Sequence, residues 1–384
     1  MPTPREDAPP ARPHLRVPAQ VPPPDLLGLR ETLVGGVAAA VLIAVIYAGS
    51  RALTTFDSAL IGYAVAIVAL TFAVVARYAR WLRMPSTGRY WRRGWQQFAS
   101  WSNFRRLPSL LPRAIVGQLL TQGFIRRRGL DRWIGHQCLF WGVIGATLIT
   151  FPLVFGWLVF HLEPGTTEMY RMWVFGFPTI TFDTSSFIGW SMFRALVYTA
   201  VLVIIGCAIF LWRRFRDRAA ITGQSLGYDM APLIALLVIS VTGLLLTVST
   251  SFFDGAYYGF LVIIHMAAVV LSLVFIPFGK FFHVLQRPAS VGIQMYTELG
   301  AQEPPRACAR CGERLAAELF VTDLRATLED LGQRYDLPAA EGMPQHVIEL
   351  CPRCKRVARG QSYFAANGPS FATALVGEAS AEER

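Results

Sequence analysis

Two histidines in one long apolar stretch are the residues of this sequence best suited to holding a redox cofactor. His265 and His283 lie eighteen positions apart within residues 259–288. If that stretch is one continuous helix, eighteen residues make about five turns, so both imidazoles leave the same face, about 27 Å apart along the axis. An ionisable residue inside a membrane helix is costly and marks a candidate functional site, and imidazole is a common axial ligand of haem iron. The spacing therefore predicts a helix that binds a cofactor.

A third histidine, His136, can approach one of these two. It opens the apolar segment 134–160, at the membrane side where the stretch 259–288 ends. Packing the two segments side by side would bring His136 and His283 together, and two facing imidazoles predict a bis-histidine haem b site inside a helical bundle. The neighbouring Arg132 and Lys280 could pair with haem propionates, or could be cations that merely mark the membrane edge.

His265 has no evident partner in the sequence. At the matching depth, the segment 134–160 offers Ala146, Thr147 and Thr150, none of which is a haem ligand. Three roles stay open for His265: ligand of a second haem together with an unidentified residue, hydrogen-bond donor to a quinone, or a packed histidine.

Four of the six cysteines form two Cys-x-x-Cys units, whereas Cys138 and Cys207 stand alone in apolar runs and are expected to be core thiols. Four thiolates suit tetrahedral Zn²⁺, although a rubredoxin-like iron or a cluster would use the same spacing, and a disulfide pair does not suit a reducing compartment. The 39 residues between the units exceed a compact ribbon, so we expect a helix there that carries Leu315, Leu324, Leu328 and Leu331. The predicted ligands are Cys308, Cys311, Cys351 and Cys354.

Composition places the chain in a membrane. Of 384 residues, 53% are hydrophobic and only 16% are charged, which excludes a disordered chain and an ordinary soluble protein. The net charge of +11 could suggest nucleic acid, but most of the arginines stand beside apolar segments, where they report membrane orientation. We therefore expect a multi-pass protein of the cytoplasmic (inner) membrane, without a cleavable signal peptide and without a nucleic-acid partner.

Six apolar segments are long enough to cross a bilayer, which takes roughly 20 helical residues. Basic residues gather after the second, fourth and sixth segments, so the positive-inside rule puts both chain termini in the cytoplasm. The predicted spans are residues 33–48, 59–79, 134–160, 188–212, 231–248 and 259–288.

A basic stretch joins the second span to the third. Residues 77–133 hold thirteen arginines against one acid, Asp131, with aromatic residues interleaved and prolines as breaks. The pattern is typical of short amphipathic helices lying on the inner membrane surface, in contact with lipid headgroups. A docking surface for a soluble partner subunit is the alternative.

These patterns divide the chain into six parts. We expect an all-α integral membrane bundle followed by a small zinc-ribbon-like soluble domain. The parts are a disordered cytoplasmic tail (1–30), two spans (31–82), the basic amphipathic loop (83–133), a four-helix cytochrome b-like domain (134–288), the four-cysteine domain (304–370) and a flexible tail (371–384).

Part of the chain resembles a known protein family. The pair His265 and His283, with Pro277-Phe-Gly-Lys280 before the second histidine, resembles the last helix of cytochrome b subunits typified by the gamma subunit of respiratory nitrate reductase. The membrane cytochromes of heterodisulfide reductases and of dissimilatory sulfite-reduction complexes are similar. The run from Arg132 to Gly135-His136 resembles that family's other ligand helix, and the resemblance covers roughly residues 130–290.

The resemblance implies a function. It assigns His136 and His283 to a haem b near the cytoplasm, whereas the outer haem would need His265 and position 146, which is Ala here. It also implies quinone chemistry, with menaquinone or another quinone, and electron exchange with a cytoplasmic iron–sulfur partner. We therefore expect the electron-transfer subunit of an oxidoreductase complex, with the zinc domain docking the partner. The alternative is a haem-free membrane anchor with a zinc-binding docking domain.

Overall fold

The computed structural model describes residues 27–216, 226–333, 335–337 and 345–367. The chain is mostly helical and divides into two compact units. The membrane unit comprises Leu27–Met84 and Trp91–Met295, and the cysteine unit comprises Pro85–Tyr90 with the residues from Tyr296 onward. Most of the predicted N-terminal tail, and all of the predicted C-terminal tail, lie outside the described residues.

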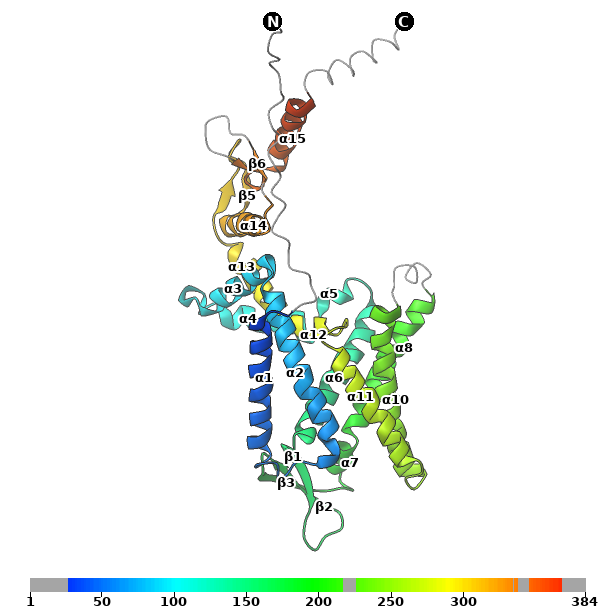
Figure 1. Cartoon of the computed structure of the whole chain (residues 1–384). Helices are drawn as coiled ribbons and strands as arrows, with labels where there is room; N and C mark the ends of the chain where they lie inside the picture. Colours follow the sequence, from blue (N-terminus) through cyan, green and yellow to red (C-terminus); the bar gives the residue numbers. More distant parts are fainter. Residues whose placement is uncertain (1–26, 217–225, 334, 338–344, 368–384) are drawn as a thin grey trace, which may run out of the picture. The chain divides into compact units, whose positions relative to one another are not determined.

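Six long apolar helices make up the membrane unit (Figure 1). Each has 18 to 25 residues and a mean hydropathy of 1.7 to 2.5, which is enough to cross a bilayer. The prediction of a multi-pass membrane protein with six spans is confirmed at this level. The helices are α1 (Leu29–Gly49), α2 (Ile61–Leu82, extended by the 3₁₀ turn Ser58–Leu60), α6 (Leu130–Val154), α8 (Ala195–Arg216), α10 (Ala231–Phe252) and α11 (Tyr258–Phe275).

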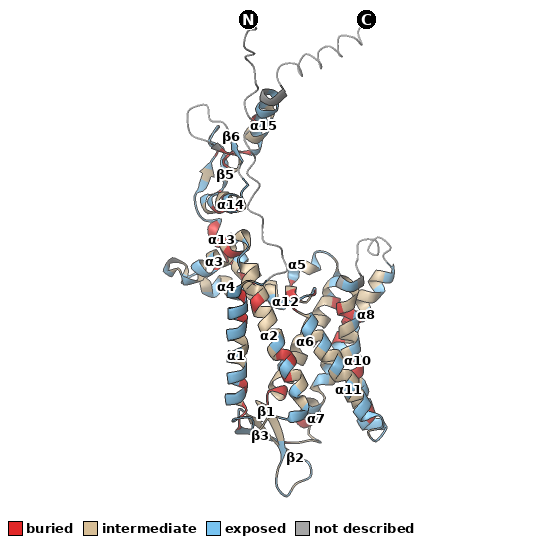
Figure 2. Cartoon of the chain, viewed as in Figure 1, coloured by how far each residue is buried: buried red, intermediate tan, exposed pale blue. Residues whose placement is uncertain are grey.

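The surfaces of these helices show how the sequence suits a lipid environment. Only 6 to 22% of each span is buried inside the protein, and Figure 2 shows long exposed stripes along the helices. The exposed residues are largely Leu, Val, Ile and Phe, such as Val37, Val65 and Leu148. Apolar side chains that face outward are stable in hydrocarbon, where they do not contact water.

Glycines set the closest helix pair, α6 with α8. A Cβ atom at Gly142 would lie 2.7 Å from Cγ2 of Val203, and one at Gly206 would lie 2.8 Å from the Gly135 carbonyl oxygen. Small residues let membrane helices approach closely and gain dispersion contacts. The Asp131 carboxylate pairs with Arg213 at 2.7 Å, where α6 begins and α8 ends.

The packing order differs from the expected one. We expected the third and sixth spans to lie side by side, but α6 packs chiefly on α8, and α11 packs on α10 and α2. The helices neighbour one another in the order α1, α2, α11, α10, α8, α6, and α6 also touches α2. The glycine contacts between α6 and α8 explain why α8 is the main neighbour of α6.

The stretch 259–288 is not one helix, so the predicted register of its two histidines is wrong. Helix α11 ends at Phe275, a turn follows, and α12 (Phe282–Gln286) carries His283. Pro277 causes the break, because proline lacks an N–H group and its ring clashes with the carbonyl of the preceding turn. His265 and His283 therefore stand on different helices.

A side chain of α2 holds this turn in place. The Arg77 guanidinium donates to the carbonyl of Pro277, and it lies 4.6 Å from the centre of the Phe282 ring. The ring of Tyr78 also meets Phe282 edge to face. The second span thus positions the segment that carries His283.

An antiparallel sheet, which the all-α prediction missed, follows α6. Strands β1 (Leu158–Leu162), β2 (Met169–Val174) and β3 (Phe177–Asp183) lie in that order. The first begins inside the predicted third span (134–160), because α6 already ends at Val154, and the others lie between the third and fourth predicted spans. Phe175 and Gly176 join β2 to β3 with positive φ angles of 50° and 74°, the geometry of a tight hairpin turn. The short helix α7 (Phe187–Phe193) then leads to α8.

The basic stretch between α2 and α6 forms short helices, as its prolines indicated. Pro85 occupies the first turn of α3, where a backbone N–H would have no partner within the helix, so the missing N–H of proline costs no hydrogen bond. The elements are α3 (Pro85–Ala99), the 3₁₀ turn Trp101–Asn103, α4 (Leu107–Ile115), the π-helical turn Val116–Leu120 and α5 (Gly123–Arg126).

The cysteine unit is a small α/β fold built around two hairpin-like strand pairs. The leucine-bearing helix expected between the cysteine pairs is present as α14, but Leu315 lies in a strand and Leu331 lies just beyond the helix end. The elements that follow α12 are α13 (Ala289–Gly300), β4 (Pro305–Ala307) paired with β5 (Arg314–Ala317), α14 (Glu318–Asp330), β6 (Asp336–Leu337) paired with β7 (Gln345–His346), a 3₁₀ turn (Val347–Glu349) and α15 (Pro352–Asn367).

Candidate functional site

His136 and His283 line one cavity of about 300 Å³ in the membrane unit. Helices α6, α8 and α10 supply its apolar walls, and residues 280–284 close it. The break after α11 makes this possible, because the turn brings α12 to the end of the bundle where α6 begins (Figure 1). The structure thus brings together two of the three histidines singled out in the sequence.

The His136 imidazole has an unused ring nitrogen. His136 lies in the second turn of α6, and its Nδ1 atom is buried without a hydrogen-bond partner among the described residues. Buried polar atoms almost always have a partner in the protein, in ordered water or in a ligand. This nitrogen is therefore available to a group that enters the cavity.

The protonation of His283 follows from its neighbour. Its Nδ1 lies 2.6 Å from the carbonyl oxygen of Lys280, which can only accept a hydrogen bond. Nδ1 therefore carries the proton, and Nε2 keeps its lone pair. Metal-ligating histidines are typically oriented by a hydrogen bond of this kind at the other ring nitrogen.

Charged residues lie at the rim of the cavity. Lys280 pairs with Asp229 at 2.7 Å, and Arg214 at the end of α8 also lines the cavity. Arg214 approaches the sulfur of Met230 at 3.3 Å. Lys280 was foreseen from the sequence as a possible partner of haem propionates, but Arg132 is not among the lining residues.

Arg214 and Asp229 were missed in the sequence. Both stand where a span meets the basic membrane face, Arg214 at the end of the fourth span and Asp229 just before the fifth. A search for charges at span ends on the face that holds His136 and His283 would have found them.

His265 lies outside this cavity. Its Nδ1 is 2.9 Å from the hydroxyl of Thr242 on α10, and that hydroxyl also lies 2.7 Å from the Val238 carbonyl. Since the hydroxyl proton goes to the carbonyl, Thr242 accepts from the Nδ1–H of His265. Gly243 leaves room for the ring, because a Cβ there would lie 3.3 Å from Cε1 of His265. His265 therefore does not share a site with His136 and His283.

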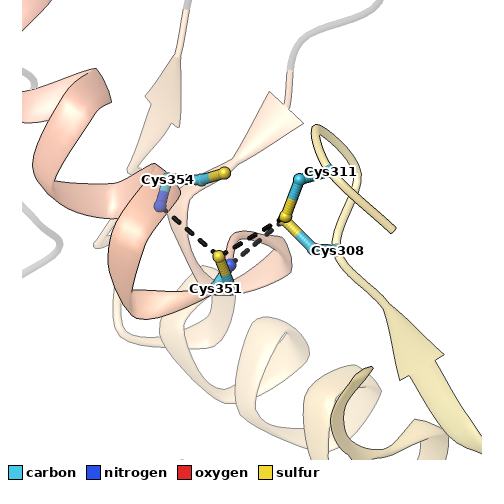
Figure 3. A group of neighbouring side chains, drawn as sticks. All are labelled: Cys308, Cys311, Cys351 and Cys354. Atoms are coloured by element: carbon cyan, nitrogen blue, oxygen red, sulfur yellow. Dashed lines mark hydrogen bonds between the residues drawn. The ribbon is translucent and has the colours of Figure 1, made fainter. Parts of the chain in front are cut away.

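The four paired cysteines form a second candidate site, in the cysteine unit. Their sulfur atoms all lie within 4.8 Å of one another, and those of Cys311 and Cys351 are 3.7 Å apart. Tetrahedral Zn²⁺ with Zn–S bonds of about 2.3 Å requires sulfurs about 3.8 Å apart, close to this spacing. Figure 3 shows the four cysteine side chains lying close together, and a group of this kind could bind a metal ion such as zinc.

Local backbone geometry builds the cysteine site from both sides. Gly312 takes a φ of +73° directly after Cys311, which closes the first knuckle, and α15 begins directly after Cys351. The backbone N–H of Cys351 donates to the Cys308 sulfur at 3.2 Å, and that of Cys354 donates to the Cys351 sulfur at 3.4 Å. Backbone donors and a helix N-terminus both favour thiolates over thiols.

The thiols differ in their readiness to ionise. Burial acts to raise the pKa of Cys308, but backbone hydrogen bonds from Cys351, Arg310 and Cys311 outweigh it and bring the pKa to about 6. Burial, together with the neighbouring thiols, raises the pKa of Cys354 to about 12. A bound divalent cation would favour the thiolate form of all four.

The two lone cysteines are not part of either site. Cys207 is fully buried on α8, and its thiol lies 3.6 Å from the Leu233 carbonyl, as expected for a core thiol. Cys138 is partly buried on α6.

Comparison of the chain with protein-family models, with curated proteins and with solved structures finds no match.

Proposed function

We propose that this multi-pass membrane protein carries haem b and passes electrons between the membrane quinone pool and a cytoplasmic iron–sulfur partner. It would be the quinone-reactive subunit of a respiratory oxidoreductase complex, similar to the gamma subunit of respiratory nitrate reductase. The proposal rests on the residues of one cavity and on the resemblance of residues 130–290 to that family.

One observation supports the proposal more than any other: His136 and His283 line the same apolar cavity. Among the described residues Nδ1 of His136 has no hydrogen-bond partner, and the hydrogen bond of His283 at Nδ1 leaves the lone pair on its Nε2. An imidazole used only for packing would be expected to have its buried nitrogens satisfied. Two imidazoles that enter one cavity from different helices are the ligand set of a bis-histidine haem in a helical bundle.

In this proposal the protein binds and tunes the cofactor. Haem would supply one-electron chemistry when bound, and His136 and His283 would be the residues that hold it. The apolar walls from α6, α8 and α10 exclude water, and the Lys280 carbonyl holds the His283 proton on Nδ1. Arg214 and Lys280 are the cationic side chains among the lining residues that could face anionic groups of the cofactor, and Lys280 is already paired with Asp229.

The route of electrons beyond this cavity also belongs to the proposal. The cysteine unit, with its metal site, would dock the iron–sulfur partner on the cytoplasmic side. Quinone would react nearer the outer side, where the hydrogen-bonded pair of His265 and Thr242 offers polar groups inside the bundle.

A reduced-minus-oxidised spectrum of the purified protein tests the proposal, with haem b quantified per polypeptide. We expect one haem in the wild type, and its loss in both His136→Ala and His283→Ala. His161→Ala is the matched control, because His161 lies on β1 and does not line the cavity. Two haems per chain would mean that His265, together with a further residue, binds a second haem. No haem in protein made under haem-replete conditions would overturn the proposal.

The cysteine cluster favours one alternative function. A haem-free membrane anchor would need only the six spans and a zinc-bearing docking unit, and the four converging sulfurs supply the latter. In that case, deletion of residues 304–384 would abolish partner binding, and the wild-type protein would show no visible absorption.

A further inference from the structure

The connection between α2 and α6 carries a surface that neither the cavity nor the cysteine cluster uses. We call residues 101–115 the interfacial segment; they comprise the 3₁₀ turn Trp101–Asn103 and helix α4 (Leu107–Ile115), and belong to the membrane unit. Because α2 ends and α6 begins at the same end of the bundle (Figure 1), the interfacial segment between them lies at that membrane face.

Hydrogen bonds hold the connection against the bundle. The Thr121 carbonyl, a few residues beyond the interfacial segment, accepts from Nε1 of Trp133 at 2.7 Å and from Nε2 of Gln137 at 3.0 Å. Both donors lie on the first turns of α6. The Arg287 guanidinium also lies 4.5 Å from the centre of the Phe124 ring. The end of the connection, at Thr121 and Phe124, is therefore held against the start of α6.

Two aromatic rings of the interfacial segment face outward. Trp101 is 85% exposed and Phe104 is 60% exposed, and their rings stack with centroids 5.4 Å apart and planes 11° from parallel. A stacked, exposed pair of this size would be unfavourable in water. Aromatic rings at the depth of lipid headgroups are the usual anchors of membrane proteins, because one side of the headgroup region is apolar and the other is wet.

The charge of the same segment is entirely positive. Arg105 and Arg113 are exposed, and the sequence holds no Asp or Glu between positions 58 and 130. Neutralising charge must come from elsewhere. At a membrane face, and beside rings suited to headgroup depth, phospholipid phosphate is the complementary anion.

We infer that the interfacial segment is a binding surface for anionic phospholipid, in which Trp101 and Phe104 insert among the headgroups while Arg105 and Arg113 bind their phosphates. The surface selects acidic lipids such as phosphatidylglycerol over zwitterionic ones, because only the former carry uncompensated negative charge. This inference does not depend on haem binding.

The test uses the full-length protein, stripped of lipid in detergent and titrated with phosphatidylglycerol or with phosphatidylcholine, with bound lipids counted by native mass spectrometry. The variant Arg105→Gln/Arg113→Gln is compared with Arg356→Gln/Arg359→Gln, which removes the same charge from exposed positions on α15. We expect the first variant to bind phosphatidylglycerol roughly 25-fold more weakly, at about fivefold per arginine, and the second to match the wild type.

A second measurement tests whether Trp101 contacts lipid. In nanodiscs that contain brominated phosphatidylglycerol, Trp101→Phe should remove a lipid-quenched component of the tryptophan fluorescence. Equal binding of the two lipids by the wild type, or unchanged binding by Arg105→Gln/Arg113→Gln, would overturn the inference. Quenching of the Trp101 fluorescence by an acidic protein, without quenching by brominated lipid, would also overturn the inference, because the surface would then bind protein. Elution of each variant as a single species in size-exclusion chromatography shows that it is folded.

Discussion

At the scale of single residues, the two candidate sites depend on groups that are positioned before any ligand arrives. The Lys280 carbonyl selects the tautomer of His283, and backbone N–H groups point at the sulfurs of Cys308 and Cys351. Pre-oriented ligands bind more tightly, because less freedom is lost on binding. Each site can therefore be tested by changing one side chain while its scaffold stays intact.

Removing one cysteine should empty the metal site. We expect Cys351→Ser to bind far less than one zinc per chain, since its buried sulfur is 3.7 Å from that of Cys311 and receives the Cys354 N–H. Metal analysis of the purified protein measures this. Cys207→Ser is the control, because that thiol belongs to the membrane unit and is not one of the four clustered cysteines. Full zinc content in Cys351→Ser would refute the four-cysteine site.

At the scale of elements, the break after α11 determines where His283 lies. In a continuous helix, His283 would lie further along the axis of α11. Because the chain turns at Pro277, His283 lies on the separate helix α12 instead. A break leaves carbonyl groups without helical partners, and Arg77 of α2 supplies a donor to one of them. The second span therefore contributes to the cavity indirectly, through this contact.

Loss of the Arg77 contact should loosen the turn. We expect Arg77→Gln to lower stability by about 1.5–3 kcal/mol, the usual worth of a hydrogen bond from a charged group, and to reduce occupancy of the cavity by its cofactor. Thermal unfolding in detergent measures the first effect and the haem spectrum the second. Arg92→Gln, an exposed arginine on α3, should change neither. Equal behaviour of the two variants would mean that Arg77 does not position the turn.

The close contact of α6 with α8 makes a second prediction at this scale. Gly142→Ala would place a methyl group 2.7 Å from Cγ2 of Val203 and 2.9 Å from the Thr199 backbone carbonyl, so the helices must separate. Overpacking of this kind costs about 1–3 kcal/mol. The matched control is Gly36→Ala on α1, where no atom lies within 4 Å. We expect a lower unfolding temperature for the first variant and no decrease for the second.

At the scale of the whole molecule, the chain combines a six-span bundle with a separate compact unit that holds the cysteines. Each unit has its own buried cluster, with Ile46, Ile67 and Phe155 in one, and Leu350 and Cys351 in the other. A chelator should therefore disorder the cysteine unit and leave the bundle folded. Limited proteolysis with and without chelator would show this as new cleavage sites confined to residues after position 300.

Membrane orientation is also a property of the whole chain. The positive-inside rule puts both termini in the cytoplasm, and this stays a prediction. A fluorescent protein fused to the C-terminus should fluoresce, and alkaline phosphatase inserted at Gly165, in the connection between β1 and β2, should be active. The reverse pattern would place the cysteine unit outside and would remove the proposed cytoplasmic partner.

Much of the architecture could be predicted from local pattern. Long runs of apolar residues determine membrane spans, because a bilayer leaves no other way to satisfy backbone polar groups than a helix or a barrel. The spacing of Cys308, Cys311, Cys351 and Cys354 likewise indicated a metal site, since a Cys-x-x-Cys turn brings its own two sulfurs together. Spans and single knuckles depend on neighbours in the chain, so the sequence alone was sufficient for them, whereas the meeting of the two cysteine pairs, 40 positions apart, was decided by folding.

Other features depended on the tertiary structure. Pro277 is visible in the sequence, but whether it kinks or ends a helix depends on partners such as Arg77, 200 positions away. The neighbour of α6 was decided by glycines on two helices at once, and Arg214 and Asp229 reach the cavity only because α8 packs beside α6 and α10 packs beside α8. The sheet after α6 forms by pairing between strands that have weak patterns of their own. Contacts between distant segments carry no local signature, and for that reason only the folded structure could decide them.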